Sequence, residues 1–156
     1  MKIPVSFKVN GERVDLEVYP HHRLIDILRQ ELDLTGAKEG CGGGECGSCT
    51  VIMNEQTVNA CLVLAPEADG AEIFTVEGLN REEELDVIQE TFIDEGALQC
   101  GYCTPGMLMS AKALLNRNPH PTREDVIEAI SGNLCRCTGY IRIVTAVLKA
   151  AEKATA

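Results

Sequence analysis

Three cysteines lie close together in a glycine-rich stretch of this sequence, and a fourth follows downstream. Residues 40–50 read Gly-Cys-Gly-Gly-Gly-Glu-Cys-Gly-Ser-Cys-Thr. This C-x4-C-x2-C spacing, with a distant fourth cysteine, suits four thiolates around a plant-type 2Fe-2S cluster. Glycine lets backbone N–H groups approach the negatively charged sulfurs without a clash from a Cβ atom. The predicted ligands of this cluster are Cys41, Cys46, Cys49 and Cys61.

The other four cysteines form two short pairs, each followed by a threonine and a predicted helix. The pairs lie in residues 100–103, Cys-Gly-Tyr-Cys, and residues 135–137, Cys-Arg-Cys. Thr104 is a predicted N-cap with Pro105 at the first helical position, and Thr138 is predicted to cap the second helix. If the two helices pack side by side, four thiolates meet where two positive helix ends converge. An anionic metal cluster suits such a place.

Other interpretations of these cysteines compete with a pair of clusters. A disulfide framework is disfavoured because cytosolic thiols stay reduced. Zinc is an alternative for either set, although zinc sites favour two paired short-spaced motifs over the first arrangement. Cys100-x-x-Cys103 alone would suit a thioredoxin-like redox pair, but the usual preceding strand is missing. Gly42-x-Gly44-x-x-Gly47 formally matches a dinucleotide fingerprint, but a strand-like run follows it where a helix is required.

Composition excludes several classes of partner. The chain has 156 residues and a formal net charge of -10 at pH 7, so nucleic acids and anionic membranes would repel it. No apolar run approaches the length of a membrane span. The sequence opens with neither a signal peptide nor a twin-arginine leader, so we expect a cytoplasmic protein without membrane insertion.

The first half of the chain carries mostly strand patterns. Apolar residues alternate from Ile3 to Val9 and again from Val14 to Val18, and Asn10-Gly11 between them predicts a hairpin turn. Leucines four residues apart predict an amphipathic helix over about 22–33. Further strands are predicted at 49–53, 57–64 and 72–76. These elements make a small mixed sheet that grasps one helix.

The second half carries helical patterns only, and the boundary is predicted at residues 78–80. Helices are expected from about residue 82 and over 104–116, 123–131 and 140–153, which together predict a four-helix bundle. Thr122 with Asp125 resembles a capping box, and Gly132 is a candidate C-cap. The residues predicted to face inward are Leu85, Ile88, Phe92, Leu108, Ala111, Leu115, Val126, Ile127, Ile130, Val144, Val147 and Ala151. The predicted fold class is therefore α+β.

Three segments together resemble the iron-sulfur subunit of the xanthine oxidase family of molybdenum hydroxylases. They are residues 40–51, 98–106 and 132–140, and they occur in the family's order. The resemblance implies a β-grasp, ferredoxin-like 2Fe-2S domain over residues 1–78 that carries the cluster on Cys41, Cys46, Cys49 and Cys61. It also implies a helical domain over residues 79–156 that carries a second 2Fe-2S cluster on Cys100, Cys103, Cys135 and Cys137.

The same resemblance implies that the chain works as part of a hetero-oligomer. A large subunit would hold a molybdenum-pterin cofactor, and a medium subunit would hold FAD. Electrons would pass from molybdenum through the helical-domain cluster and then the ferredoxin-domain cluster to the flavin. Gln99 and Cys137 are expected to approach the pterin. The chain would then be the electron-transfer subunit of an oxidoreductase, and the alternatives are a free two-cluster ferredoxin or a structural zinc protein.

Overall fold

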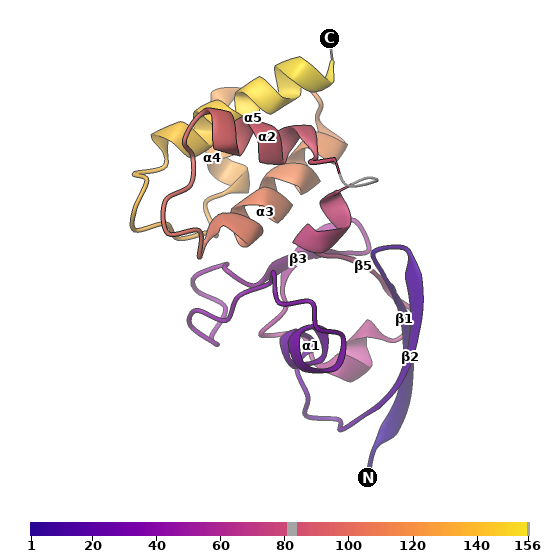
Figure 1. The fold of residues 1–156 in the computed structure, drawn as a ribbon. Coiled ribbons are helices and arrows are strands. Elements are labelled where there is room, and N and C mark those ends of the chain that lie inside the picture. The colour runs from indigo at the N-terminus through magenta and orange to yellow at the C-terminus, as the bar shows by residue number, and fades with distance from the viewer. Residues whose placement is uncertain (81–83, 156) are drawn as a thin grey trace.

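The computed structural model describes residues 1–80 and 84–155, and it has the α+β architecture that the sequence predicts. A five-stranded sheet, one short α-helix and two 3-10 turns (Ala65–Ala68 and Val76–Leu79) form the first half, and four α-helices form the second half, stacked above the sheet in Figure 1. The N-terminus lies at the far end of the sheet half and the C-terminus at the far end of the helical half. Within the described ranges, no helix is long and apolar enough to cross a bilayer.

The opening hairpin has the predicted form. Strand β1 (Ile3–Val9) pairs antiparallel with β2 (Glu12–Val18). The turn residues Asn10 and Gly11 have φ angles of 51° and 87°. Both angles are positive, as a two-residue type I′ turn requires, and Asn-Gly tolerates them best. Alternate side chains of β1 enter the core, with Val5, Phe7 and Val9 all buried.

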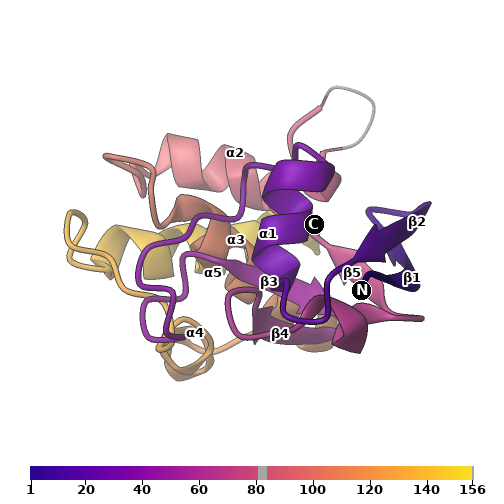
Figure 2. The ribbon, with the colours of Figure 1, turned by 90° about the horizontal axis from the view of Figure 1, so that it is seen from below.

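The rest of the sheet is completed by three short strands in the order β2-β1-β5-β3-β4. These are β3 (Thr50–Met53), β4 (Gln56–Asn59) and β5 (Glu72–Phe74). Helix α1 (Leu24–Asp26) continues as a wider π-helical turn over Ile27–Glu31 and packs on one face of the sheet (Figure 2). The predicted helix over 22–33 is therefore present but shorter.

The predicted strand over 57–64 was too long, and the reason concerns the cysteine within it. Strand β4 ends at Asn59, where the backbone turns: the N–H of Leu62 donates to the carbonyl of Asn59 at 2.8 Å. The N–H of Ala60 donates to the carbonyl of Cys49 at 3.3 Å. These turns place Cys61 beside Cys49, which a continued strand would not do. Leu62 and Leu64, at the end of the predicted strand, are 59 % and 42 % exposed, so the apolar run does not mark a longer ladder.

Four helices form the second half, as predicted. They are α2 (Val87–Asp94), α3 (Thr104–Arg117), α4 (Arg123–Ala129) and α5 (Ile141–Ala154). Helix α2 packs on α5, and α4 contacts both α3 and α5 (Figures 1 and 2). The helix predicted from residue 82 begins later, at Val87, because Asp86 is its N-cap: the Asp86 carboxylate accepts from the N–H of Ile88 at 3.0 Å. Residues 82 and 83 of that prediction lie outside the described residues.

Two of the predicted helix caps were wrong. Thr104 lies within the first turn of α3, and the cap position belongs to Cys103, which makes no side-chain cap bond. The cap of α5 is Tyr140, not Thr138. Both helices begin where a cysteine loop dictates the backbone path, so the local preference of threonine for N-caps does not decide the start.

Three smaller predictions in the helical half were also wrong. Ile130 takes the C-cap position of α4, so Gly132 lies beyond it. Leu85 and Ile127 are 42 % and 48 % exposed, respectively, and do not face inward. Leu85 precedes the observed start of α2, and Ile127 lies on a helix of only two turns that buries one narrow face. Ile88, three residues after Leu85, and Val126, the residue before Ile127, are buried in the core.

The capping box at Thr122 is confirmed and makes a specific stability prediction. The Thr122 hydroxyl accepts from the N–H of Asp125 at 3.2 Å, and the Asp125 carboxylate accepts from the N–H of Thr122 at 2.8 Å. Replacing Thr122 with alanine should cost about 1 kcal/mol and lower the apparent Tm by about 2–4 °C, measured by thermal unfolding of the cluster-loaded chain. Thr122→Ser keeps the oxygen and should stay near wild type; an equal loss in both variants would contradict the capping role.

The two halves share a tight junction. Strand β3 lies between them: its Val51 side chain is buried with α1, and its Ile52 side chain is buried in the helical core beside Leu79. Helix α3 packs directly on β3. The cysteine loops lie at one edge of this junction, so the packing that joins the halves also brings the two sets of thiols near one another.

Candidate metal centres

The backbone of the loop that follows Cys41 turns back and points its N–H groups at the Cys41 sulfur. Three N–H groups, those of Gly43, Glu45 and Cys46, donate to the Cys41 sulfur at 3.3–3.4 Å. These backbone hydrogen bonds lower the pKa of Cys41 to about 6, because they favour the thiolate. Gly42 has a φ of 65°, which lets the chain turn back toward the sulfur. The loop therefore stabilises negative charge on sulfur before any metal is bound.

The thiols of this first set fall into two adjacent pairs. Cys41 and Cys46 interact at the exposed side of the loop, and Cys49 and Cys61 interact in the interior. Burial raises the pKa of Cys49 to about 12. Because a buried thiol keeps its proton at neutral pH, binding of a metal to the Cys49 sulfur must release that proton. The structure thus brings together all four cysteines that the sequence predicted.

The second set has the same form at the start of α3 and before α5. The sulfurs of Cys100 and Cys137 are 3.6 Å apart on the surface, and Cys103 and Cys135 interact deeper in the protein. Burial raises the pKa of Cys103 to about 12. Burial is the largest influence on Cys135 and opposes its ionisation, but hydrogen bonds with Thr138, Cys137 and Cys103 together outweigh burial and lower the pKa of Cys135.

Thr138 and Tyr140 have roles that the sequence did not indicate. The backbone N–H of Thr138 donates to the Cys135 sulfur at 3.4 Å, and the hydroxyl of Thr138 lies 3.1 Å from the same sulfur. Tyr140, with a φ of 68°, turns its hydroxyl back to accept from the N–H of Cys135 at 2.8 Å. These contacts hold the Cys135–Cys137 turn closed. Helical periodicity gave no signal for them, because they lie in the irregular loop before α5.

The thiols fit two binuclear iron–sulfur clusters. All eight cysteines are free of disulfides and form two groups of four, and each group divides into two pairs. A 2Fe-2S cluster takes four thiolates, two on each iron. Paired thiols are the donor set of a binuclear cluster.

Direct hydrogen bonds connect the two cysteine regions. The N–H of Leu134 donates to the carbonyl of Cys46 at 2.9 Å. Tyr102 lies between Cys100 and Cys103 in the sequence, and its hydroxyl donates to the carbonyl of Glu39 at 2.6 Å. Close contact at this point depends on glycine, because a Cβ on Gly106 would lie 2.2 Å from the Gly47 carbonyl oxygen. The two candidate centres are therefore held in one rigid arrangement.

The two residues predicted to contact a pterin lie side by side. The side-chain amide of Gln99 donates to the backbone carbonyl of Cys137 at 3.2 Å. Both residues are exposed, on the same face as Cys100. The structure therefore presents Gln99 and Cys137 together at the surface of the second thiol set.

Comparison with known proteins defines the class. Residues 7–79 match the family described as 2Fe-2S iron-sulfur cluster binding domain, and residues 75–148 match the 2Fe-2S binding domain. The fold and the thiol groups together define an iron-sulfur protein with two 2Fe-2S modules.

Several relatives match almost from end to end. The nicotinate dehydrogenase small FeS subunit of Eubacterium barkeri is 50 % identical over 152 residues, which are 97 % of each chain. The nicotine 6-hydroxylase small subunit of Paenarthrobacter nicotinovorans is 51 % identical over 149 residues, covering 96 % of this chain and 90 % of that one. Quinoline 2-oxidoreductase from Pseudomonas putida 86 contains a chain of the same fold, with a TM-score of 0.95 and 45 % identity over 99 % of this chain and 96 % of that chain. The protein belongs to the family of iron-sulfur subunits of the xanthine oxidase type of molybdenum hydroxylases.

A further structural match shows the same fold inside a longer chain. The aldehyde oxidoreductase of Desulfovibrio desulfuricans ATCC 27774 matches 97 % of this chain, with a TM-score of 0.94 and 44 % identity, but only 17 % of its own length is covered. In that enzyme the equivalent of this protein is one part of a larger polypeptide. Membership of the family makes this protein a subunit of a hetero-oligomeric oxidoreductase that takes part in electron transfer.

Proposed function

We propose that this protein relays electrons between a molybdenum-pterin centre in a large partner subunit and FAD in a medium partner subunit. The observation that carries the proposal is the arrangement of eight free thiols in two groups of two pairs, linked by direct hydrogen bonds. Each 2Fe-2S cluster, when bound, accepts and returns one electron. The protein's own contribution is to hold the two clusters at a fixed separation and to set their potentials by burial and hydrogen bonding.

Ligands are assigned in pairs. In the first cluster, Cys41 with Cys46 would bind the outer iron, and Cys49 with Cys61 would bind the inner iron. The second cluster would take Cys100 with Cys137 on the exposed iron and Cys103 with Cys135 on the buried iron. The support for this assignment is the pairwise contact between the thiols and the different exposure of each pair.

Gln99 and Cys137 are proposed to face the pterin of the large subunit. Support comes from their adjacency, from the exposure of both, and from the role of Cys137 as an outer ligand. The cluster on Cys100, Cys103, Cys135 and Cys137 would then receive electrons first, and the cluster on the Cys41 loop would pass them to the flavin. By this assignment residues 1–78 form the FAD-side domain and residues 79–156 the molybdenum-side domain.

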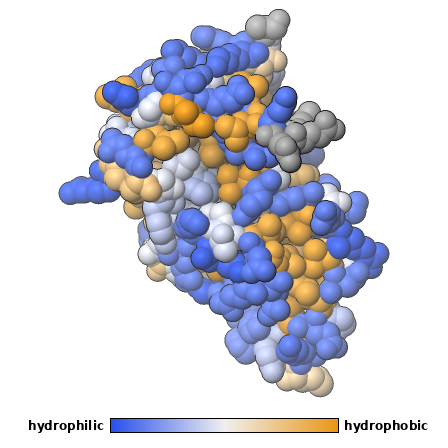
Figure 3. Space-filling view, viewed as in Figure 1, coloured by the Kyte–Doolittle hydropathy of each residue, from blue (hydrophilic) through white to orange (hydrophobic). Residues whose placement is uncertain are grey.

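Exposed apolar side chains beside the cysteines favour a bound subunit over a free ferredoxin. Leu62 follows Cys61 and is 59 % exposed, and Leu134 precedes Cys135 and is 56 % exposed. Ile141 is 67 % exposed at the start of α5. Figure 3 shows apolar residues gathered on the helical half and again on the sheet half of a mostly hydrophilic face. Apolar surface of this kind marks sites of protein contact, and a carrier that diffuses freely would present polar residues there.

The proposed compartment is the cytoplasm, where eight thiols stay reduced for cluster assembly.

The test measures the metal content of the native protein and identifies the subunits that co-purify with it. Purified anaerobically, the chain should contain about four iron and four sulfide and show two distinct paramagnetic signals after reduction. Affinity capture from its host should recover a molybdenum-containing subunit and a flavin-containing subunit. One or two zinc atoms in place of iron would refute the iron–sulfur assignment, and a fully loaded monomer without partners would favour the free ferredoxin.

A further inference from the structure

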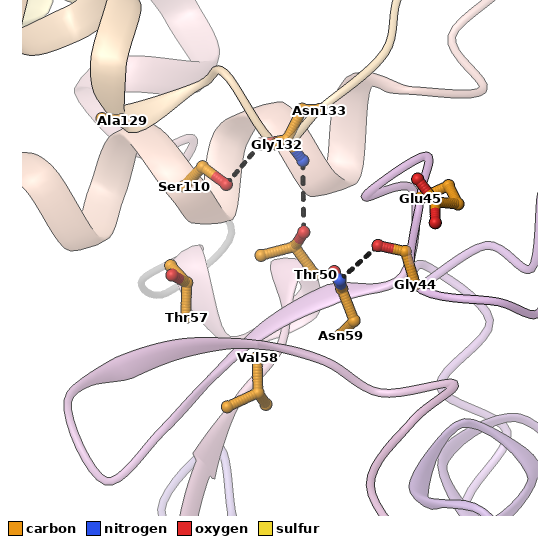
Figure 4. A pocket seen from close by; sticks show the side chains of 10 residues that line it. All are labelled: Gly44, Glu45, Thr50, Thr57, Val58, Asn59, Ser110, Ala129, Gly132 and Asn133. Carbon is orange, nitrogen blue, oxygen red and sulfur yellow. Dashed lines mark hydrogen bonds between the residues drawn. The ribbon is translucent and has the colours of Figure 1, made fainter.

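A single buried amide lies between the two cysteine regions. Asn133 is only 3 % exposed, and its side-chain nitrogen donates to the Gly47 carbonyl at 2.9 Å and to the Thr50 hydroxyl at 3.1 Å. Its side-chain oxygen accepts from the hydroxyl of Ser110 at 2.7 Å. Figure 4 shows this amide reaching down from the helical half to Thr50 at the start of β3, with Ser110 of α3 beside it. Every polar atom of the Asn133 side chain is therefore engaged.

The orientation of this amide is fixed by its neighbours. A backbone carbonyl can only accept, so the atom that faces Gly47 must be the donor nitrogen. The Thr50 hydroxyl donates its hydrogen to the Gly47 carbonyl at 2.7 Å. Its oxygen can therefore only accept from Asn133. Reversing the amide would place two acceptors against each other in a buried site, which is costly. Among the twenty side chains, asparagine supplies this donor and acceptor at this length.

The contacts of Asn133 join both sets of thiols. Gly47 lies between Cys46 and Cys49 in the first loop, while Asn133 lies two residues before Cys135 in the second. Ser110 is on α3, the helix that begins directly after Cys103. The amide thus bonds to the first cysteine loop and to α3 at once, from a position within the second cysteine loop.

We propose that Asn133 is a positioning residue that sets the separation and relative orientation of the two clusters, an inference that rests on the electron-relay function proposed above. Electron transfer between two centres slows steeply as their distance grows, so a loop shift between them acts directly on the rate. The side-chain hydrogen bonds of Asn133 and Ser110 within residues 1–80 and 84–155 go to Gly47, Thr50 and each other, so the proposed effect works through the Gly47 and Leu134 backbone.

Asn59 offers a matched control within the same loop. Its side-chain nitrogen donates to the Gly44 carbonyl at 2.9 Å, the same distance that separates Asn133 from the Gly47 carbonyl (Figure 4). Asn59 lies on β4, so this bond stays within the sheet half. Asn59→Asp and Asn133→Asp each place a carboxylate oxygen against a carbonyl of the first cysteine loop. Only Asn133→Asp disturbs a hydrogen bond that crosses between the two halves.

The experiment uses the cluster-loaded complex in two states: fully reduced, in which both clusters are paramagnetic, and partly reduced, in which one electron passes between the clusters. In Asn133→Asp we expect the magnetic splitting between the clusters to change in the first state, and electron transfer between them to slow in the second. Both individual signals and the iron content should remain. Asn59→Asp should keep the wild-type splitting and rate. If Asn133→Asp fails to load, Asn133→Ala, which removes the amide without adding a charge, is measured in its place.

The outcomes separate this inference from the function on which it rests. Wild-type splitting and rate in the Asn133 variants, or an equal change in Asn59→Asp, would overturn the positioning role while leaving the relay intact. Failure of Asn133→Ala to hold either cluster would also overturn it, because the residue would then serve folding in general. A wild-type protein without two iron–sulfur signals would refute the relay function itself.

Discussion

Replacing Cys103 with serine is expected to remove one cluster and leave the other, so that about two of the four irons remain. Cys103 is half-buried, and its thiol interacts with that of Cys135, so its loss removes one of the two inner thiolates of the second set. A serine hydroxyl holds its proton far more strongly than a thiol and does not replace a soft thiolate ligand. Iron and sulfide analysis with electron paramagnetic resonance of the reduced protein measures both consequences.

The reciprocal change provides the control for this experiment. Cys49→Ser, in the buried pair of the first set, should abolish the other paramagnetic signal and keep the one lost in Cys103→Ser. Each variant should still associate with its partner subunits, since the inner cysteines are not on the surface. In the assembled enzyme either change should interrupt the relay and lower turnover with a flavin-side acceptor by orders of magnitude. Loss of both signals in both variants would contradict two separately held clusters.

Part of the grouping of the thiols could be anticipated from the sequence, because within each short cysteine motif the information is local. A C-x4-C-x2-C loop can place three thiols together without help from distant residues, and only Cys61 needed the fold to bring it near. The hairpin turn at Asn10-Gly11 was predictable for the same reason, because two backbone angles decide it. Where one or two residues determine a feature, composition and spacing indicate it.

Features that depend on the junction between the halves could not be predicted in this way. The Asn133 amide bonds to Gly47, 86 residues away, and nothing in a Gly-Asn-Leu segment indicates that partner. The threonines after each cysteine pair have the right residue type for helix caps, yet the cysteine loops fix the helix starts one or more residues elsewhere. Local propensity is a weak preference, and a hydrogen-bonded loop overrides it.

The glycines of the junction show how closely the halves approach, and Gly47 is the most constrained of them. Its φ is 68°, and a Cβ there would lie 2.3 Å from the Gly132 carbonyl oxygen and 2.7 Å from the Asn133 side-chain nitrogen. The first of these atoms is backbone and cannot rotate away. An alanine at this position would therefore have to push the second cysteine loop off the first.

Gly47→Ala should lower the stability of the protein by about 2–5 kcal/mol, the sum of about 1–2 for a left-handed residue and about 1–3 for overpacking. At about 2–4 °C per kcal/mol the apparent Tm should fall by roughly 4–20 °C. Gly43→Ala is the matched control: it lies in the same loop, its φ is outside the left-handed region, and the nearest atom to an added Cβ is 4.0 Å away.

Gly106→Ala separates the two causes of this loss. A Cβ on Gly106 would approach the same Gly47 carbonyl from α3, at 2.2 Å, but Gly106 is helical and carries no backbone penalty. Its destabilisation should therefore reflect the steric part alone and be smaller than that of Gly47→Ala. Thermal unfolding of the four proteins ranks them, and a Gly47→Ala protein as stable as Gly43→Ala would show that the halves are not in the close contact on which the relay geometry depends.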